Sequence, residues 1–276
     1  MNSCQHHYKF FPTLFANLWH NRQLIFQMTK RELLGRYRGS VIGLAWSFFN
    51  PIFMLAVYTF VFSVIFKARW NSSGEENKTQ FAIILFVGLI IHGLFSEIVN
   101  RAPSVIKSNI NYVKKVIFPL EILPVIITLT ALIHGFISLL VLLIAFVIFN
   151  SFLHWTVLLI PLILLPLIII SLGFAWLLAS FGVFLRDVEQ TIGITTTILM
   201  FASPVFYPIT ALPEVYRPWI MANPLTFFIE QTRELLIWGR LPDWSGFIIH
   251  MIVSLIIAWI GFTWFQKTRK GFADIL

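Results

Sequence analysis

The sequence lacks the residue patterns by which many enzymes bind nucleotides or metals or carry a nucleophile. It has no G-x-x-x-x-G-K-[ST] loop for phosphates, no H-E-x-x-H or C-x-x-C metal motif and no G-x-S-x-G nucleophile motif. We therefore expect no catalytic residue, no metal site and no cofactor bound by this chain itself. ATP cannot be held by this chain through a P-loop.

Cysteine and acidic residues are scarce. The 276 residues include one cysteine, Cys4, and 12 acidic residues against 20 lysines and arginines, which gives a formal net charge of +8. A single cysteine excludes an internal disulfide. The first residues contain no apolar stretch followed by a small-residue cleavage site, so we expect no cleaved signal peptide.

Polar residues are too few to cover a soluble fold of this length. Hydrophobic residues make up 58% of the chain, and the mean hydropathy is +0.83. We predict an all-α integral membrane protein with six transmembrane helices, each about as long as the hydrocarbon layer requires. The expected spans are residues 41–66, 81–100, 121–149, 156–185, 190–207 and 247–265. Asn50-Pro51 is expected to kink the first span.

Lysine and arginine set the expected orientation. Six spans place both termini on one side, and that side holds fourteen of the basic residues against six on the other. The positive-inside rule therefore predicts cytoplasmic termini and a cytoplasmic 101–118 loop. This loop carries Arg101, Lys107, Lys114 and Lys115 with no acid before Glu121, and we expect a short helix in it.

Two further segments are apolar without being spans. Residues 1–40 form an expected amphipathic interface segment that lies in the headgroup layer; it either only anchors the chain or also shapes an opening for a substrate. Residues 209–244 are expected to form two short re-entrant helices at the outer leaflet. Pro213 and Pro224 stand at expected first helical positions, Asn223 caps the second helix and Gly239 ends it. On the polar face of the second helix, Glu230, Arg233 and Glu234 are expected to pair with one another. The two helices form either an outer gate or a surface cap.

The spans hold almost no acidic residue near their middle, which argues against a carrier driven by cations or protons. The energy for any transport should then come from elsewhere. His92, His134 and His250 lie in or near spans without an acidic neighbour in sequence, so we expect structural hydrogen bonds for them. Aromatic residues are abundant, with 29 Phe, 10 Trp and 6 Tyr, and they suit either a passage for sugar rings or ordinary packing against lipid.

Three stretches carry a family resemblance. They are KRELLGRYRGSVIGLAWSFFNPIFMLAVYTFVFSVIFK at 30–67, NYVKKVIFPLEILP at 111–124, and the 186–239 segment with LRDVEQ, SPVFYPITALPE and NPLTFFIEQTRELLIWG. Together they resemble the permease subunits of type-2 ABC exporters for bacterial surface polysaccharides, in particular O-antigen exporter permeases, whose product enters lipopolysaccharide. The resemblance covers nearly the whole chain.

The resemblance implies a homodimer of this chain that docks on two copies of a separate ABC ATPase, which binds ATP and Mg. It implies a multi-pass protein of the bacterial inner membrane and a polysaccharide substrate on an undecaprenyl diphosphate carrier. The residues implied to couple the 101–118 loop to the ATPase are Ser108, Asn109, Asn111, Tyr112, Val113, Lys114 and Lys115.

The remaining implied sites lie along the substrate path. The residues implied to meet the carrier diphosphate at the inner leaflet are Arg31, Arg36 and Arg38. Solvated charges that follow the positive-inside rule explain these three arginines equally well. The aromatic residues implied to line the channel are Trp46, Phe49, Tyr58, Phe62, Phe201 and Phe206. The residues implied at the periplasmic gate are Pro213, Pro224, Phe228, Glu230 and Arg233.

Three alternatives stay open. The same architecture could export capsular polysaccharide or teichoic acid. A membrane-embedded transferase acting on a lipid-linked sugar would need clustered acids or histidines at one membrane face, and the linear sequence shows no such cluster beyond the short Asp187-Val188-Glu189 turn. A passive channel would conduct without partner or nucleotide.

Overall fold

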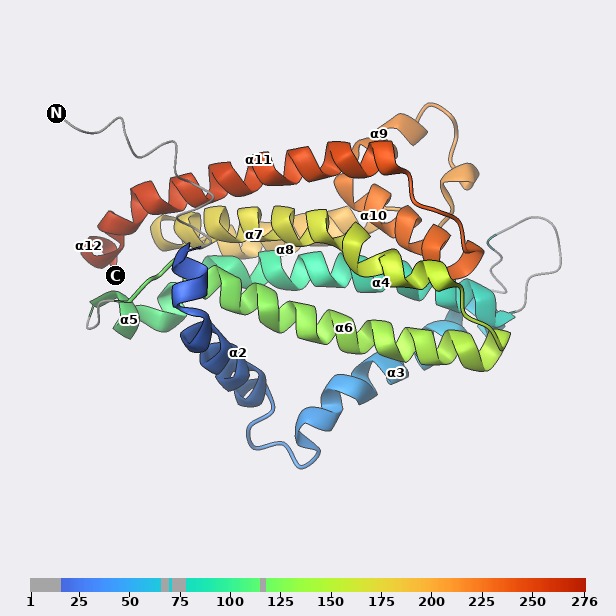
Figure 1. The fold of residues 1–276 in the computed structure, drawn as a ribbon, viewed down its shortest axis with the longest axis horizontal. Helices are drawn as coiled ribbons and strands as arrows, with labels where there is room; N and C mark the ends of the chain where they lie inside the picture. The colour runs from blue at the N-terminus through green and yellow to red at the C-terminus, as the bar shows by residue number, and fades with distance from the viewer. Residues whose placement is uncertain (1–15, 66–69, 71–77, 115–117) are drawn as a thin grey trace.

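The computed structural model describes residues 16–65, 70, 78–114 and 118–276, and every regular element in these ranges is helical. The predicted all-α fold is therefore confirmed for this part of the chain. The longer helices are α2 (Arg22–Arg36), α3 (Trp46–Tyr58), α4 (Lys78–Arg101), α6 (Ile122–Asn150), α7 (Ile160–Phe184), α8 (Val188–Phe201), α10 (Pro224–Arg233) and α11 (Trp244–Thr268) (Figure 1). The short ones are α5 (Ile110–Lys114), α9 (Arg217–Ala222) and α12 (Phe272–Ile275).

Within the described residues, four helical segments have the length and hydropathy of membrane spans. They are Gln80–Ser104, Ile122–Asn150, Trp155–Phe184 and Trp244–Ile275. Each exceeds the roughly 20 residues that cross the hydrocarbon layer. These segments match the second, third, fourth and sixth expected spans.

The two other expected spans coincide with shorter helices. The first contains the 13-residue α3, with Pro51 inside it, and a π-helix η3 (Thr59–Ile65) that continues it. The fifth contains the 14-residue α8. The expectation that this helix would run to Tyr207 was wrong, because α8 ends at Phe201 and the chain turns sharply before Val205. Pro204, which lacks an N–H, lies in this turn.

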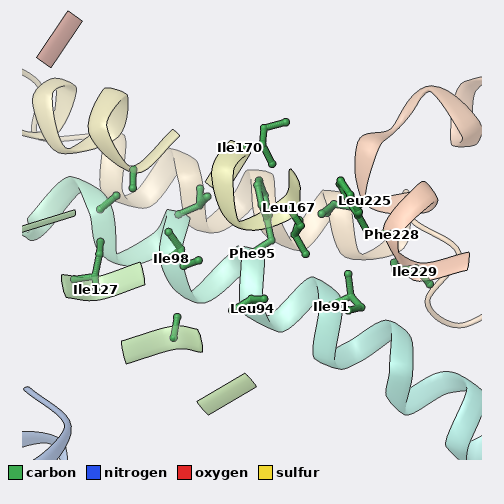
Figure 2. Packing of buried hydrophobic residues seen from close by; sticks show 14 of the residues in the cluster. Ile91, Leu94, Phe95, Ile98, Ile127, Leu167, Ile170, Leu225, Phe228 and Ile229 are labelled. Carbon is green, nitrogen blue, oxygen red and sulfur yellow. The ribbon is translucent and has the colours of Figure 1, made fainter. Parts of the chain in front are cut away.

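Helix α4 lies at the centre of the bundle and packs against α6, α7, α8 and α10 (Figure 1). Its buried side chains include Ile91, Phe95 and Ile98. They belong to one buried cluster with Leu167 of α7 and Phe228 of α10, and Figure 2 shows Phe95 beside Leu167. Because α4 contacts all four of these helices, any movement of α4 must be accommodated by all of them.

Helices α7 and α11 run side by side with their backbones in close contact (Figure 1). A Cβ atom added to Gly173 would lie 2.8 Å from the backbone of Ala258, and one added to Gly261 would overlap the carbonyl oxygen of Gly173. Small residues that allow such an approach are the usual basis of helix packing within membranes. This pair is therefore a tightly fixed part of the fold.

Helices α2 and α3 form the amino-terminal arm of the described chain, and both pack against α6. Helix α2 packs on α6, with Ile25 and Thr29 buried, while Phe26 and Leu34 are exposed. Helix α3 then rises along α6, so that α2 and α3 form a V below the bundle in Figure 1. At the other end of the chain, η9 (Arg269–Gly271) and α12 fold back beside α5.

Candidate functional site

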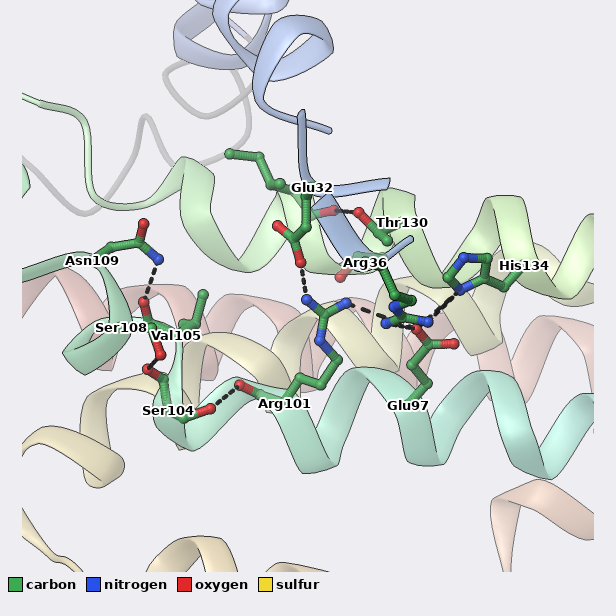
Figure 3. Close-up of polar contacts among 12 residues, drawn as sticks. Glu32, Arg36, Glu97, Arg101, Ser104, Val105, Ser108, Asn109, Thr130 and His134 are labelled. Atoms are coloured by element: carbon green, nitrogen blue, oxygen red, sulfur yellow. Dashed lines mark hydrogen bonds and ion pairs between the residues drawn. The ribbon is translucent and has the colours of Figure 1, made fainter. Parts of the chain in front are cut away.

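The basic loop after α4 has a defined path. Two short 3-10 turns, η4 (Ala102–Ser104) and η5 (Lys107–Asn109), lead into the helix α5. The Ser108 hydroxyl donates a hydrogen bond of 2.9 Å to the Ser104 carbonyl, and the Asn109 side-chain amide donates one of 2.8 Å to the Val105 carbonyl (Figure 3). Local bonds of this kind satisfy backbone groups at irregular helix ends. The predicted short helix is confirmed, although its α-helical part covers only 110–114.

Helix α5 presents polar residues outward and one apolar residue inward. Asn111 and Lys114 are exposed, and Val113 packs against the hydrophobic core. Lys115, the last residue expected to contact a partner, lies outside the described residues. Helix α5 thus exposes the amide of Asn111 and the ammonium group of Lys114, while Val113 anchors its other side.

Helix α2 touches this loop directly. Arg31 donates a hydrogen bond of 3.3 Å to the Tyr112 hydroxyl, and the Tyr112 ring stacks on Phe118 with centroids 4.6 Å apart. A cavity of about 340 Å³ lies between α2 and the loop, lined in part by Glu32 and Arg101. Helix α2 and the loop are therefore neighbours that can move together.

A charged network joins α2 to α4 and α6. The Arg36 guanidinium lies 2.6 Å from a Glu97 carboxylate oxygen and 2.7 Å from Nδ1 of His134 (Figure 3). The same Glu97 oxygen lies 3.2 Å from His134 Nδ1 and 3.7 Å from Arg101, and Arg101 also forms an ion pair with Glu32. Glu97 is thus shared by three basic groups from three helices. Ionisable groups within a membrane are commonly paired in this way.

A polar cavity of about 370 Å³ adjoins the network. Arg36, Glu97 and His134 line one part of it, and Asn50 and Tyr58 of α3 line another. Nε2 of His134 is buried without a hydrogen-bond partner among the described residues. A polar cavity of this size has room for water or for a small polar group.

The three arginines expected at the inner leaflet have different surroundings. Arg31 bonds to Tyr112, Arg36 pairs with Glu97, and Arg38 is exposed. All three are exposed, but among the described residues Arg31 and Arg36 also contact other parts of the chain, whereas the Arg38 side chain forms no hydrogen bond or ion pair. Of the three, Arg38 is the freest to meet an anionic headgroup.

The six aromatic residues expected along a channel are exposed or half-buried: Trp46, Phe49, Tyr58, Phe62, Phe201 and Phe206. Four of them follow one another in ring contact. The centroid distances are 6.3 Å from Tyr58 to Phe62, 6.2 Å from Phe62 to Phe206 and 5.6 Å from Phe206 to Phe201. This aromatic row connects η3 with the end of α8.

The two short helices expected within residues 209–244 are confirmed as helical, with one start predicted correctly and one not. Pro224 begins α10, and the Asn223 side chain accepts a hydrogen bond of 3.0 Å from the Leu225 N–H. Gly239 ends η8 (Glu234–Trp238) with a positive φ of 64°. Pro213 was expected to begin the first helix, but α9 begins at Arg217, because the Pro213 carbonyl closes a turn with the Tyr216 N–H instead.

Arg233 was expected on the polar face of α10 together with Glu230 and Glu234. Its pairing with Glu230 at 2.6 Å is confirmed, but its placement was wrong, because the Arg233 side chain is fully buried. Phe228 is fully buried beside it. Glu234 pairs instead with the exposed Arg240. Helix α10 thus places the charged guanidinium of Arg233 in the protein interior.

Asp243 connects α10 to α11. Its backbone N–H donates to the Gln231 side chain of α10 at 2.8 Å, and its carboxylate caps α11 by accepting from the Ser245 N–H. The Ser245 hydroxyl, which donates to the same carboxylate, lowers the pKa of Asp243 below its usual value. The carboxylate thus caps α11, and the backbone N–H of Asp243 ties α10 to the start of α11.

Residues 23–237, more than three quarters of the chain, match the model of one family, described as the ABC-2 type transporter. The chain belongs to the ABC-2 type transporter family. The four apolar spans of the described residues fit a membrane component of this family, and relatives of the chain are named as export permeases.

Relatives of this ABC-2 protein cover nearly its whole length. It is 29% identical over 263 residues to the O-antigen export system permease protein RfbA of Myxococcus xanthus, a match that covers 95% of this chain and 98% of the relative. RfbA of Klebsiella pneumoniae is 24% identical over 94% of this chain and 97% of its own. The polysialic acid transport protein KpsM of Escherichia coli is 23% identical over 87% of this chain and 92% of its own.

Sequence reasoning missed the polar network of this ABC-2 transporter. The structural hydrogen bonds expected for His92, His134 and His250 are confirmed, but the acidic partner of His134, Glu97, was not predicted. The partners are 37 and 61 residues apart in sequence, so no local pattern joins them. The one available signal was Glu97 itself, an acid inside an apolar span.

Proposed function

We propose that this ABC-2 protein is the transmembrane permease subunit of an ATP-driven exporter that moves lipid-linked O-antigen polysaccharide across the bacterial inner membrane. The observation that carries this proposal is the similarity, along nearly the whole chain, to permeases named for O-antigen export. The absence of a phosphate-binding loop from the sequence supports an energy source outside the chain.

A separate ABC ATPase supplies that energy and binds ATP and Mg in this proposal. Two copies of the permease pair as a homodimer and dock on two ATPase copies through α5 and its flanking turns. The exposed Asn111 and Lys114 offer a hydrogen-bonding and charged surface for this contact. Arg31, through its bond to Tyr112, would carry the displacement of the loop into α2. Closure of the ATPase pair then becomes a rigid-body motion of the helices.

The proposed topology has six spans with both termini in the cytoplasm. Helix α3 and η3 together cover Trp46–Ile65, 20 residues, which suffices for a first span. Helix α8 and the turn after it form the fifth, and α9 and α10 are re-entrant helices at the outer leaflet. The lysine and arginine distribution supports this orientation.

The proposed substrate path runs along the aromatic row. The undecaprenyl diphosphate carrier reaches the protein at the inner leaflet, where Arg31, Arg36 and Arg38 provide positive charge. Sugar rings then pass along Tyr58, Phe62 and the aromatic residues at the end of α8. Stacking on aromatic faces tolerates many sugar sequences, which suits a long polysaccharide.

A capsular polysaccharide is the second candidate substrate, favoured by the similarity to KpsM, and teichoic acid is a third. Deletion of the gene tests all of them, since the unexported lipid-linked glycan should accumulate inside the cell. We expect O-antigen repeats on a diphosphate carrier in the accumulated material. Accumulation of capsular polysaccharide or teichoic acid would identify that glycan as the substrate in place of O-antigen. Glycan transfer by the purified chain without an ATPase would show that the protein is a transferase and not a transporter.

A further inference from the structure

Arg233 is a fully buried arginine that bonds to three separate parts of the chain. Its Nε donates to the carbonyl of Ile84 in α4 at 3.1 Å. Its two terminal nitrogens donate to the carbonyls of Pro204 at 2.7 Å and Val205 at 3.1 Å, in the turn after α8. One of them also donates to Glu230 of the same helix at 2.6 Å. Arg233 therefore fastens α10 to α4 and to the end of α8.

The surroundings of the guanidinium fit its shape. The ring of Trp70 lies under it, 4.4 Å from its central carbon. Helix α4 leaves room for it at Gly88, where an added Cβ would lie 3.0 Å from the Arg233 Nη2 atom. Only a planar group with donors on several edges can serve these carbonyls at once, and lysine has no such geometry.

The other end of α10 is attached to the same turn. The Asn223 side-chain amide donates to the Ser203 hydroxyl at 2.8 Å and to the Ala202 carbonyl at 3.2 Å, while its oxygen caps α10. Residues 202–205 are thus bonded at both ends of one ten-residue helix. Separating α10 from this turn would leave a buried charge and several buried carbonyls without partners, which is strongly unfavourable.

We propose that α10, the outer half of α4 and the turn at residues 202–205 move as one rigid block, with Arg233 as its positioning residue. This proposal rests on the proposed export function and on the pairing of two copies. The outer exit then opens at the boundary between the two blocks, one from each copy. Helix α10 does not swing away from α8 as a separate lid.

Crosslinking tests this block directly. Cys4 is replaced by serine, Ser203 and Asn223 are replaced by cysteine, and the two thiols are joined by a short bis-methanethiosulfonate linker in the permease–ATPase complex in vesicles. Because the two positions do not separate, the linked complex is expected to export polysaccharide at the rate of the same protein after reduction. Loss of export on linking, reversed by a reductant, would overturn the proposal. If the unmodified complex exports no polysaccharide at all, it is the proposed function that fails.

Arg233→Lys provides the second measurement, with Arg240→Lys as its matched control at an exposed position. Arg233→Lys is expected to lower export by at least about tenfold while the ATPase in the complex continues to hydrolyse ATP, because only the outer block is misplaced. Arg240→Lys should leave both rates unchanged. A fall of ATP hydrolysis in parallel with export, or export at the wild-type rate, would show that Arg233 does not position the exit.

Gly88→Ala and Gly93→Ala form a further matched pair of variants in α4. The added methyl at Gly88 presses on Arg233 and on the Val205 backbone, 3.2 Å away, whereas nothing lies within 4 Å of the methyl at Gly93. Gly88→Ala should therefore reproduce the loss of export with retained ATP hydrolysis, and Gly93→Ala should not. Equal export by the two variants would contradict the role given to Arg233.

Discussion

Arg36 of α2 and Glu97 of α4 form an ion pair of 2.6 Å between a helix outside the bundle and the helix at its centre. His134 of α6 and Arg101 at the end of α4 share the same carboxylate. This contact holds the amino-terminal arm to the helix that continues into the basic loop. A displacement of that loop therefore reaches both α2 and the core of the bundle.

Glu97→Gln should loosen the arm, because the substitution removes the one negative charge shared by Arg36, His134 and Arg101. We expect a loss of stability of about 1–2 kcal/mol, since the carboxylate is only partly buried. Thermal unfolding in detergent measures this loss, and proteolysis should cut between α2 and α3 faster. Glu214→Gln, at an exposed ion pair, is the control and should stay within about 0.5 kcal/mol of wild type. Equal stability of the two variants would show that the network does not hold the arm.

The packing of α7 on α11 gives a second prediction. Gly261→Ala places a methyl group against the Gly173 carbonyl, and we expect it to destabilise the protein by about 1–3 kcal/mol through overpacking. Gly193→Ala in α8 is the control, because a methyl group there meets no atom within 4 Å. Thermal unfolding of both variants in the same detergent measures the difference in stability between them. A Gly261→Ala protein as stable as Gly193→Ala would mean that the two helices lie further apart.

A helix-breaking change in the basic loop should separate ATP hydrolysis from export. Val113→Pro removes a backbone N–H from α5 and should disrupt this short helix at a local cost of about 3 kcal/mol, while the spans stay folded. We expect the complex with the ATPase to lose export and the variant to keep its thermal unfolding temperature. Val113→Ala, which preserves the helix, should export. Wild-type export by Val113→Pro would remove α5 from the mechanism.

The sequence predicted those parts of the fold that depend on local chemistry. Asn223 before Pro224 specified the start of α10, and Gly239 specified the end of η8, because caps and left-handed turns depend on neighbouring residues. Pro213 misled the same reasoning, since proline also suits turns. The four long apolar spans followed from hydropathy alone.

The contacts across the bundle could not be predicted from local patterns. Arg233 looked like a surface residue on a helix with neighbouring acids. Its burial is explained by the carbonyls of Ile84, Pro204 and Val205, which come from other parts of the chain. The partners of Glu97 are likewise distant in sequence. Such pairs depend on which helices become neighbours, and a single sequence does not contain that information.

The orientation of the chain can be tested by labelling single cysteines in intact cells. In a Cys4→Ser background, Asn111→Cys in α5 should react with a membrane-impermeant maleimide only after the inner membrane is opened. Glu214→Cys, in the exposed turn before α9, should react from outside the inner membrane. Labelling of residue 111 from outside would place the basic loop on the wrong side for any contact with a cytoplasmic ATPase.

Reconstitution tests most directly whether this chain is a conduit without its own source of energy. The purified protein is placed in vesicles with and without its ABC ATPase, and ATP hydrolysis is measured together with movement of radiolabelled lipid-linked O-antigen across the bilayer. We predict that neither activity occurs with the permease alone and that both appear when the ATPase is added. ATP hydrolysis by the isolated chain, or glycan movement without the ATPase, would contradict the account.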